Sequence, residues 1–145
     1  MKLTQSGIDL IKSFESCRLT AYPDPGTKAA PYTIGYGHTG SEVHLGLIWT
    51  IEQAESALLA DLSKVVAHLQ PLIHLDLNDN QFSACVSLAY NIGVGNFEHS
   101  TLLRMINAGG TGPASLEFPK WDKAAGKEMP GLLRRRLAEQ RLFNS

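Results

Sequence analysis

The sequence predicts an α+β fold in a single domain of 145 residues, with an N-terminal helix, a small antiparallel β-sheet and a larger all-helical lobe. Apolar residues recur at helical spacing near the amino terminus and again beyond residue 50, whereas the segment between them is rich in glycine, proline and β-forming residues. We therefore assign residues 4–16 to the first helix, about 16–48 to the small lobe and about 50–145 to the helical lobe. A cleft is expected where the sheet and the helices meet.

The first helix is predicted because apolar residues follow Thr4, a suitable N-cap, at intervals of three and four. Glu15 falls at the carboxyl end of this helix. The negative end of the helix dipole disfavours a carboxylate there, unless a partner compensates. The position of Glu15 therefore indicates either a function or a dedicated partner.

The small sheet is predicted from turn and strand residues that follow the helix. The segment Tyr22-Pro23-Asp24-Pro25-Gly26 is typical of a turn, and the segment from Pro31 to His38 mixes β-formers with glycines. Two or three short strands fit this pattern best. Gly35, Gly37 and Gly40 match G-x-G-x-x-G, but residues 41–46 read as extended chain rather than as a helix, which argues against dinucleotide binding. We expect these glycines to let a strand pack closely against a helix or a flat ligand.

Helical patterns continue from residue 50 to the end of the chain. Thr50 and Gln53 form a capping box for a helix that ends near Pro71. Asn78 begins a second helix, apolar nearly all round, which we expect to be the central core helix and to end at Gly93. The remaining helices are expected after Ser100 or Thr101, around Leu116, Phe118 and Trp121, and over residues 132–143 behind Pro130-Gly131.

Composition excludes several classes of function. With 13 Lys+Arg against 14 Asp+Glu, the surface has no overall positive field for nucleic acid or an anionic membrane. No apolar segment is long enough for a membrane span, and no export signal is visible at the amino terminus. The 5 histidines form no zinc-binding motif, so no metal is expected, and Cys17 and Cys85 are expected to be small buried apolar residues.

Glu15 and Asp24 are the leading candidates for chemistry. One ends a helix and the other lies in the turn that leads into a sheet, so the two carboxylates could face each other across a cleft. Glycosidic hydrolysis needs such a pair in unlike environments, with one group protonated and the other ionised. The spacing alone leaves open that Glu15 is an ordinary helix-end charge and Asp24 an ordinary turn residue.

His38 and the basic carboxyl end of the chain are the two further features of interest. His38 is expected to be a hydrogen-bonded histidine that ties the sheet to a helix. From Lys120 onward, 7 Lys and Arg stand against 3 Asp and Glu, so the last helix could hold an anionic polymer or an active-site carboxylate. The alternative is a solvated helix face on which Arg135 or Arg136 pairs with Glu139.

Several segments together resemble the phage-type lysozymes, or endolysins, of glycoside hydrolase family 24. The likeness covers nearly the whole chain. It consists of Glu15 at a helix end, Ala21-Tyr22-Pro23-Asp24, Tyr32-Thr33-Ile34-Gly35-Tyr36-Gly37-His38-Thr39, Thr50-Ile51-Glu52-Gln53-Ala54-Glu55, Ala89-Tyr90-Asn91-Ile92-Gly93, Phe118-Pro119-Lys120-Trp121 and Pro130-Gly131-Leu132-Leu133-Arg134-Arg135-Arg136 with Glu139. The resemblance implies a lysozyme-like fold and hydrolysis of the β-1,4 bond between N-acetylmuramic acid and N-acetylglucosamine in peptidoglycan.

The resemblance also implies roles for individual residues. Glu15 corresponds to the general acid, and Asp24 with Thr33 to the groups that position or activate the attacking water. Eight residues separate Asp24 from Thr33, so the turn is about three residues longer than is usual in the family. Substrate contacts are expected from Tyr32, Gly35, Tyr36 and His38.

Partners and location follow from the same resemblance. We expect a monomer that needs no metal or organic cofactor, binds peptidoglycan strands, and accumulates in the host cytoplasm until a holin opens the inner membrane. Two alternatives remain at this stage. A lytic transglycosylase shares the helix-end Glu but does not need Asp24, and a catalytically silent wall-binding or regulatory domain could keep the fold.

Overall fold

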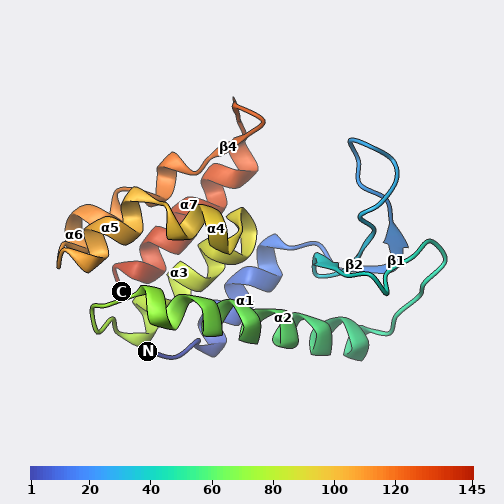
Figure 1. Cartoon of the computed structure of the whole chain (residues 1–145), viewed down its shortest axis with the longest axis horizontal. Helices are drawn as coiled ribbons and strands as arrows, with labels where there is room; N and C mark the ends of the chain where they lie inside the picture. The colour runs from blue at the N-terminus through green and yellow to red at the C-terminus, as the bar shows by residue number, and fades with distance from the viewer. The chain divides into compact units, whose positions relative to one another are not determined.

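The computed structural model describes all residues, 1–145, and these form two compact units (Figure 1). The helical unit consists of Met1–Ile11 and Val65–Ser145, and the sheet unit consists of Lys12–Lys64. Helices α1 (Gln5–Phe14) and α2 (Ile51–Leu72) each contribute residues to both units. The sheet unit therefore extends beyond the small lobe expected over residues 16–48.

The sheet unit contains three short antiparallel strands in the order β1 (Arg18–Tyr22), β2 (Thr33–Gly35), β3 (His38–Thr39). Arg18 pairs with Gly35 and Tyr22 with Thr33, so β1 has extra residues and an irregular register between these pairs. The middle of β1 bonds instead to the segment before α2, since Trp49 N donates to Leu19 O at 2.8 Å. This arrangement confirms the predicted small sheet.

A small apolar core holds the sheet unit together. Ala21, Ile34 and Val43 are buried, and Tyr32, Leu47 and Trp49 pack against them. The predicted capping box begins α2, because Gln53 N donates to Thr50 Oγ1 at 3.2 Å and Thr50 N donates to Gln53 Oε1 at 2.8 Å. The helix ends at Leu72, just past the predicted end near Pro71.

The helical unit is built around α3 (Asp79–Ile92), against which α7 (Pro130–Phe143) packs. Every side chain from Phe82 to Ala89 is buried, which confirms α3 as the central core helix. Asn78 caps its start, as predicted, and forms a capping box with Gln81. The shorter elements around this pair are α4 (Val94–Glu98), α5 (Thr101–Asn107), α6 (Thr111–Ser115) and the 3₁₀ helix η1 (Phe118–Lys120).

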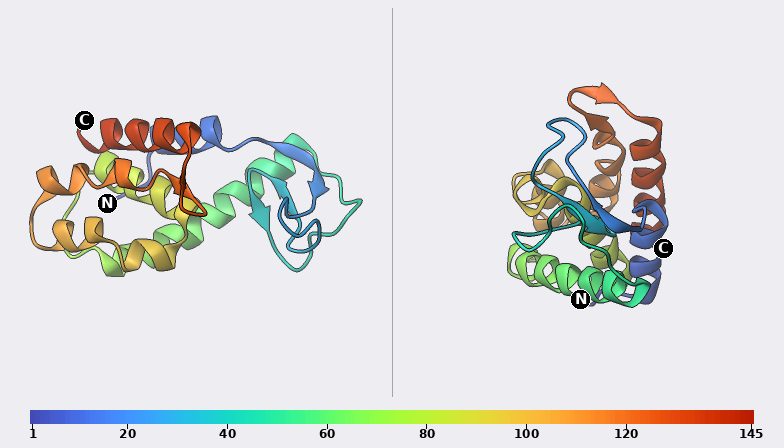
Figure 2. Two further views of the ribbon diagram at one scale, coloured as in Figure 1. Left: turned by 90° about the horizontal axis from the view of Figure 1, so that it is seen from above. Right: turned by 90° about the vertical axis from the view of Figure 1, so that its right-hand side faces the viewer.

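Two elements of the helical unit were not predicted. Gly93, with φ of 93°, ends α3 and directly precedes helix α4. A glycine that ends one helix can thus begin another. A short hairpin joins η1 to α7, as Figure 2 shows. Its strands are β4 (Lys123–Ala124) and β5 (Lys127–Glu128), with two residues each. Its turn uses positive φ at Ala125 and Gly126, and its strands are too short for an alternating pattern to appear in the sequence.

Other boundaries shift by a few residues. Leu116 and Trp121 lie just outside α6 and η1, although both were expected within a turn or two of helix. Pro130 occupies the first turn of α7, as predicted from its fixed φ. None of the helices combines the length and the apolar character that crossing a bilayer requires.

Candidate active site

Glu15 lies where the sequence predicts it, directly after the last residue of α1 and three residues before β1. Thr4 caps the start of that helix, because its Oγ1 accepts a hydrogen bond from Gly7 N at 3.0 Å. The Glu15 side chain is half-buried. The carboxylate is thus carried on the short connection between a capped helix and the first strand of the sheet unit.

Asp24 and Thr33 come to the same end of the β1–β2 hairpin. Thr33 begins β2 opposite Tyr22, and Asp24 follows Tyr22 by two residues. The lengthened turn closes on Asp24, whose backbone N donates to Ala29 O at 3.0 Å and whose backbone O accepts from Lys28 N at 2.7 Å. The hairpin therefore brings to one end two residues that lie nine positions apart in the sequence.

The Asp24 carboxylate is held by its own turn. Its Oδ2 accepts a hydrogen bond from Thr27 N at 3.0 Å, and Oδ1 accepts none from the protein. The turn-forming interpretation of Asp24 is thus confirmed. One oxygen fixes the orientation of the side chain while the other can interact with solvent or a ligand, so a structural role does not compete with a chemical one.

Gly35 lets β2 pack tightly against the start of α2. Its φ is +67°, and a Cβ atom at this position would lie 3.2 Å from Trp49 Cζ3 and 3.3 Å from Ala54 Cβ. Side chains rarely tolerate both constraints together. The prediction that a glycine allows close approach to a helix is confirmed here, and Gly35 is itself buried.

His38 ties the sheet to α2, as predicted. Its Nδ1 lies 2.7 Å from Asp61 Oδ2 on α2, and its Nε2 lies 2.6 Å from Glu42 Oε1. Burial disfavours the charged imidazole, but the two carboxylates outweigh it and raise the pKa of His38. The same contact with His38 lowers the pKa of Glu42. We name these three residues the His38 clamp.

Tyr36 belongs to a second polar group in the sheet unit. It is 9% exposed, hydrogen-bonds Cys17, and has Lys12 Nζ 5.5 Å above its ring. Burial, followed by Cys17, raises the pKa of the Tyr36 hydroxyl. Lys12 also pairs with Glu55 at 3.0 Å. Cys17 is therefore partly exposed, contrary to the prediction, because it borders this polar group rather than the apolar core.

Tyr32 packs on apolar residues in the structure, and Cys85 is buried. Tyr32 packs against the small core and lines a cavity of about 650 Å³ together with Pro31, Thr39 and Ser41. Cys85 is fully buried, as predicted, and burial raises the pKa of its thiol. No group of three or more His, Cys, Asp or Glu side chains in the chain is arranged to hold a metal ion.

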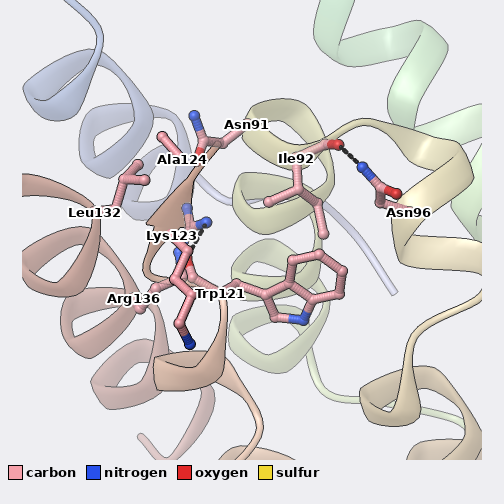
Figure 3. A pocket seen from close by; sticks show the side chains of 8 residues that line it. All are labelled: Asn91, Ile92, Asn96, Trp121, Lys123, Ala124, Leu132 and Arg136. Atoms are coloured by element: carbon pink, nitrogen blue, oxygen red, sulfur yellow. Dashed lines mark hydrogen bonds between the residues drawn. The ribbon is translucent and has the colours of Figure 1, made fainter. Parts of the chain in front are cut away.

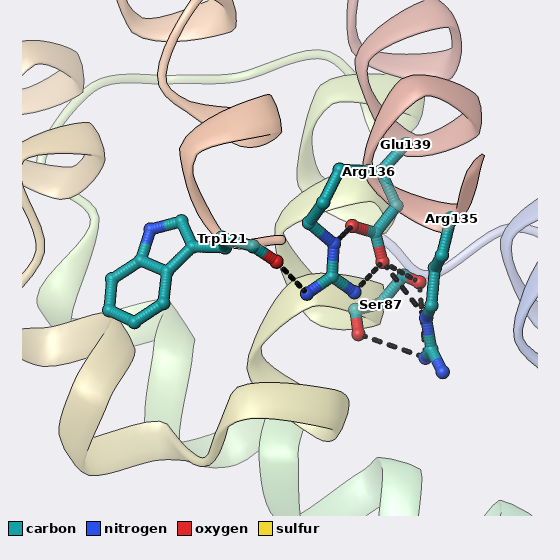
Figure 4. Close-up of polar contacts among 5 residues, drawn as sticks. All are labelled: Ser87, Trp121, Arg135, Arg136 and Glu139. Carbon is teal, nitrogen blue, oxygen red and sulfur yellow. Dashed lines mark hydrogen bonds and ion pairs between the residues drawn. The ribbon is translucent and has the colours of Figure 1, made fainter. Parts of the chain in front are cut away.

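The basic end of the chain contains ion pairs between α7 residues that are buried. Arg136 Nε lies 2.7 Å from Glu139 Oε1, and Arg135 Nε lies 3.2 Å from Glu139 Oε2 (Figure 4). The predicted pairing is confirmed, but the solvated face is wrong, since these three side chains are at most 3% exposed. Ser87 of α3 donates its hydroxyl hydrogen bond to Glu139, so the ion pairs join α7 to α3. Burial raises the pKa of Glu139, and Arg136 and Arg135 oppose that effect.

A pocket of about 340 Å³ adjoins this buried network in the helical unit (Figure 3). Arg136 connects the two, because its Nη1 donates to Trp121 O at 3.4 Å. The lining comes from the end of α3, α4, β4 and α7, and consists of Asn91, Ile92, Asn96, Trp121, Lys123, Ala124, Leu132 and Arg136. Sequence reasoning missed this pocket, because its residues are widely separated along the chain and show no shared motif.

Sequence reasoning also missed two supporting residues in the sheet unit. Asp61 on α2 pairs with His38, although no motif around it indicates this role. Trp49 stands beside both Gly35 and His38, with its ring centroid 5.4 Å from that of His38. A lone tryptophan before a helix cap carries no signal that would indicate such a position.

Comparisons with known proteins agree on one family. Residues 12–139 match the family model described as phage lysozyme. The endolysin of Bacillus phage PZA is 46% identical over 149 residues, which cover 100% of this chain and 56% of that protein. The endolysin of Acyrthosiphon pisum secondary endosymbiont phage 1 is 44% identical, with 100% of this chain and 99% of that protein covered.

A solved structure supports the same relationship. The muramidase domain of SpmX from Asticaccaulis excentricus superposes with a TM-score of 0.90 at 36% identity, covering 99% of this chain and 98% of that one. The chain thus matches one structure and one relative over their full length, but spans only about half the length of the Bacillus phage protein.

Proposed function

Because this chain belongs to the phage lysozyme family, we propose that it hydrolyses the β-1,4 bond between N-acetylmuramic acid and N-acetylglucosamine in peptidoglycan. The observation that carries the proposal is the placement of Glu15, Asp24 and Thr33. All three lie on one short stretch of the sheet unit, with Asp24 and Thr33 at the same end of the β1–β2 hairpin and Glu15 just before β1.

In this mechanism Glu15 is the general acid. Cleavage of the glycosidic bond leaves an alkoxide unless the bridging oxygen receives a proton as the bond breaks. The half-buried carboxyl group of Glu15 lies between α1 and β1 and is the group assigned to give that proton. The cycle closes when Asp24 releases to solvent the proton it takes from the water and Glu15 takes one up.

Asp24 and Thr33 act on the water. Oδ1 of Asp24 can accept a proton from the attacking water, while the Thr27 amide holds Oδ2 in place. The Thr33 hydroxyl supplies a second hydrogen bond to the same water from the facing strand. If the enzyme inverts the anomeric centre, the carboxyl groups of Glu15 and Asp24 should lie roughly 6.5–9.5 Å apart in the substrate complex.

The other candidate residues support the substrate. We propose that Tyr32 and Tyr36 border the bound sugar and that Gly35 and His38 shape the surface beneath it, since both are tied to α2. No metal or organic cofactor enters this mechanism. The protein is proposed to act as a monomer on peptidoglycan strands, and to reach the wall from the host cytoplasm after a holin opens the inner membrane.

Glu15→Gln tests the proposal, because glutamine keeps the shape of the side chain but has no acidic proton. We expect hydrolysis of purified peptidoglycan to fall by about 10²–10⁴-fold, measured as release of reducing ends. Glu98→Gln, which changes an exposed carboxylate in the helical unit, is the matched control and should keep full activity. Undiminished lysis of permeabilised cells by Glu15→Gln would contradict the assignment of Glu15 as the acid. Absence of hydrolysis by the wild-type chain would instead favour a silent wall-binding domain.

Product analysis separates hydrolysis from the transglycosylase reaction. Hydrolysis adds water and leaves a reducing N-acetylmuramic acid, whereas intramolecular closure gives an anhydro product lighter by one water. We expect only the reducing product in mass spectra of the digest. Asp24 follows Tyr22, the strand partner of Thr33, by two residues. Its presence supports the hydrolytic route, since the transglycosylase route needs no such residue.

A further inference from the structure

A pocket of about 360 Å³ lies beside the first turns of α2, and its lining contains none of the residues assigned to the reaction. Its walls are Trp49, Glu52, Gln53 and Ser56. Pockets of this size lie in the range that small ligands occupy. All four residues belong to the sheet unit, so the pocket is formed within one compact body.

The aromatic wall of this pocket is held firmly. Trp49 N donates to Leu19 O at 2.8 Å, and the Trp49 ring packs against Gly35, where a Cβ atom would lie 3.2 Å from Cζ3. The ring is also tilted against that of His38 at a centroid distance of 5.4 Å. A partly exposed indole that cannot move is a suitable surface for stacking, because little side-chain entropy is lost when a ligand binds.

The polar walls retain free hydrogen-bonding capacity. Gln53 Oε1 accepts from Thr50 N at 2.8 Å, which orients the side chain and leaves its amide Nε2 as a donor. Glu52 and Ser56 lie four residues apart on one face of the exposed helix surface, and neither side chain bonds within the protein. The pocket thus offers one carboxylate acceptor, one amide donor and one hydroxyl beside one indole.

This set of groups selects a class of ligand. The hydroxyls of a sugar ring need donors and acceptors around their edge, and the apolar face of the ring stacks on an aromatic side chain. The Glu52 carboxylate can accept hydrogen bonds from sugar hydroxyls. Apolar side chains also gather near Trp49, since Ile48 is 71% exposed and Ile51 45% exposed, and they can pack against an acetamido methyl group.

We propose that the Trp49 pocket is a second saccharide site, which binds N-acetylglucosamine units of the glycan strand away from the residues that cleave it. The identity of the strand rests on the proposed function, whereas the saccharide chemistry rests on the pocket itself. Binding at a second point on an insoluble polymer raises the effective concentration of enzyme at its surface. The site therefore contributes to retention on the wall rather than to bond cleavage.

The test is a binding experiment in the Glu15→Gln background, which prevents turnover. Chitotetraose is titrated into the protein, and amide shifts of Gln53 and Ser56 are followed by NMR. We expect a saturable response, and Ser56→Arg, which places a large charged side chain in the pocket, should weaken it by at least about tenfold. Ser63→Arg, at an exposed position of the same helix outside the pocket, is the matched control and should leave the response unchanged.

Ser56→Arg is preferred to Trp49→Ala, because Trp49 also supports Gly35 and His38 and its loss would disturb the sheet unit. Co-sedimentation with purified peptidoglycan gives a second measurement, in which Ser56→Arg lowers the bound fraction relative to Ser63→Arg. Absence of any shift at Gln53 and Ser56, or equal sedimentation of the two variants, would overturn the proposal. Hydrolysis by the wild-type chain is assayed separately, so failure of the saccharide site and failure of the proposed function give different results.

Discussion

Three charged side chains lie in the core of the helical unit, whereas the candidate catalytic carboxylates of the sheet unit lie at the ends of short elements. Arg135, Arg136 and Glu139 are buried and satisfy one another between α7 and α3. Glu15 follows α1, and Asp24 follows β1, and both are half-buried. Removing one partner of the buried ion pairs should therefore reduce stability, whereas the two half-buried carboxylates are the groups proposed for proton transfer.

The two units also differ in how much apolar surface they bury. Helix α3 buries eight successive residues from Phe82 to Ala89, whereas the sheet unit has a core of Ala21, Ile34 and Val43. The sheet unit also buries Ala54, Leu58 and Leu62 of α2, but no run of successive buried residues like that of α3. The Gly35 contact and the His38 clamp supply the additional constraints. Stability and chemistry are thus expected to respond to different mutations in the two units.

Asp24→Asn should have the largest effect, and that effect should be on activity. Asparagine can still accept the Thr27 hydrogen bond, so the turn survives, but it cannot take a proton from water. We expect kcat for peptidoglycan hydrolysis to fall by about 10²–10⁴-fold with little change in Tm. Thr33→Ala should cost less, since the hydroxyl only helps to position the water. A greater loss in Thr33→Ala than in Asp24→Asn would reverse the assigned roles.

Glu139→Ala should have the largest effect on stability. The substitution leaves the guanidinium groups of Arg135 and Arg136 buried without their carboxylate. We expect the free energy of unfolding to fall by about 3–5 kcal/mol, measured by urea denaturation. Arg134→Ala, an exposed change one turn earlier on α7, should stay within about 0.5 kcal/mol of wild type. Equal losses in the two variants would mean that the buried network contributes nothing specific.

The sequence predicts the helix starts and the small sheet better than it predicts the β4–β5 hairpin. The capping box at Thr50 and the cap residue Asn78 marked the starts of α2 and α3, because a cap is a local pattern of a few residues. The sheet was expected from turn and strand residues alone. The β4–β5 hairpin was missed because two-residue strands show no periodicity, and its turn depends on a positive φ at Ala125.

Site residues could be predicted where they depend on local sequence, but not where they depend on contacts between distant parts of the chain. Glu15 and Asp24 could be singled out because each stands at the end of a recognisable element. Arg135 and Arg136 could be paired with Glu139 from their spacing on one helix, but their burial depends on α3, some 50 residues away. Nothing in the order of residues indicates that Trp49 stands between the sheet and its pocket, since that requires the fold itself.

Gly35→Ala should have an intermediate effect on both stability and activity. Alanine at φ +67° is strained, and its Cβ would also press on Trp49 and Ala54. We expect a loss of about 2–3 kcal/mol in the free energy of unfolding, together with reduced hydrolysis, because β2 also carries Thr33. Gly46→Ala is the matched control, since Gly46 has φ +91° but nothing within 4 Å of a Cβ. It should lose only about 1–2 kcal/mol, and an equal loss in both would show that close packing at Gly35 is unimportant.

His38→Gln should have the smallest effect, and it should depend on pH. Because the clamp raises the pKa of His38 in the folded state, its contribution to stability is complete below the unfolded value of about 6.5 and is lost as pH rises through the folded value. Because the clamp lowers the pKa of Glu42, that carboxylate keeps its charge until the solution becomes more acidic than its usual range. The clamp should therefore be strongest around pH 6.

The measurement is the difference in the free energy of unfolding between wild type and His38→Gln across a pH series. Glutamine can keep one neutral hydrogen bond but not the charge, so we expect a difference of about 1–2 kcal/mol near pH 6 that shrinks as the solution becomes alkaline. His44→Gln removes an exposed histidine that contacts only a backbone oxygen, and it controls for loss of an imidazole. A difference that grows with rising pH would have the wrong sign for a charged clamp, and would mean that neutral His38 is the form that holds β3 to α2.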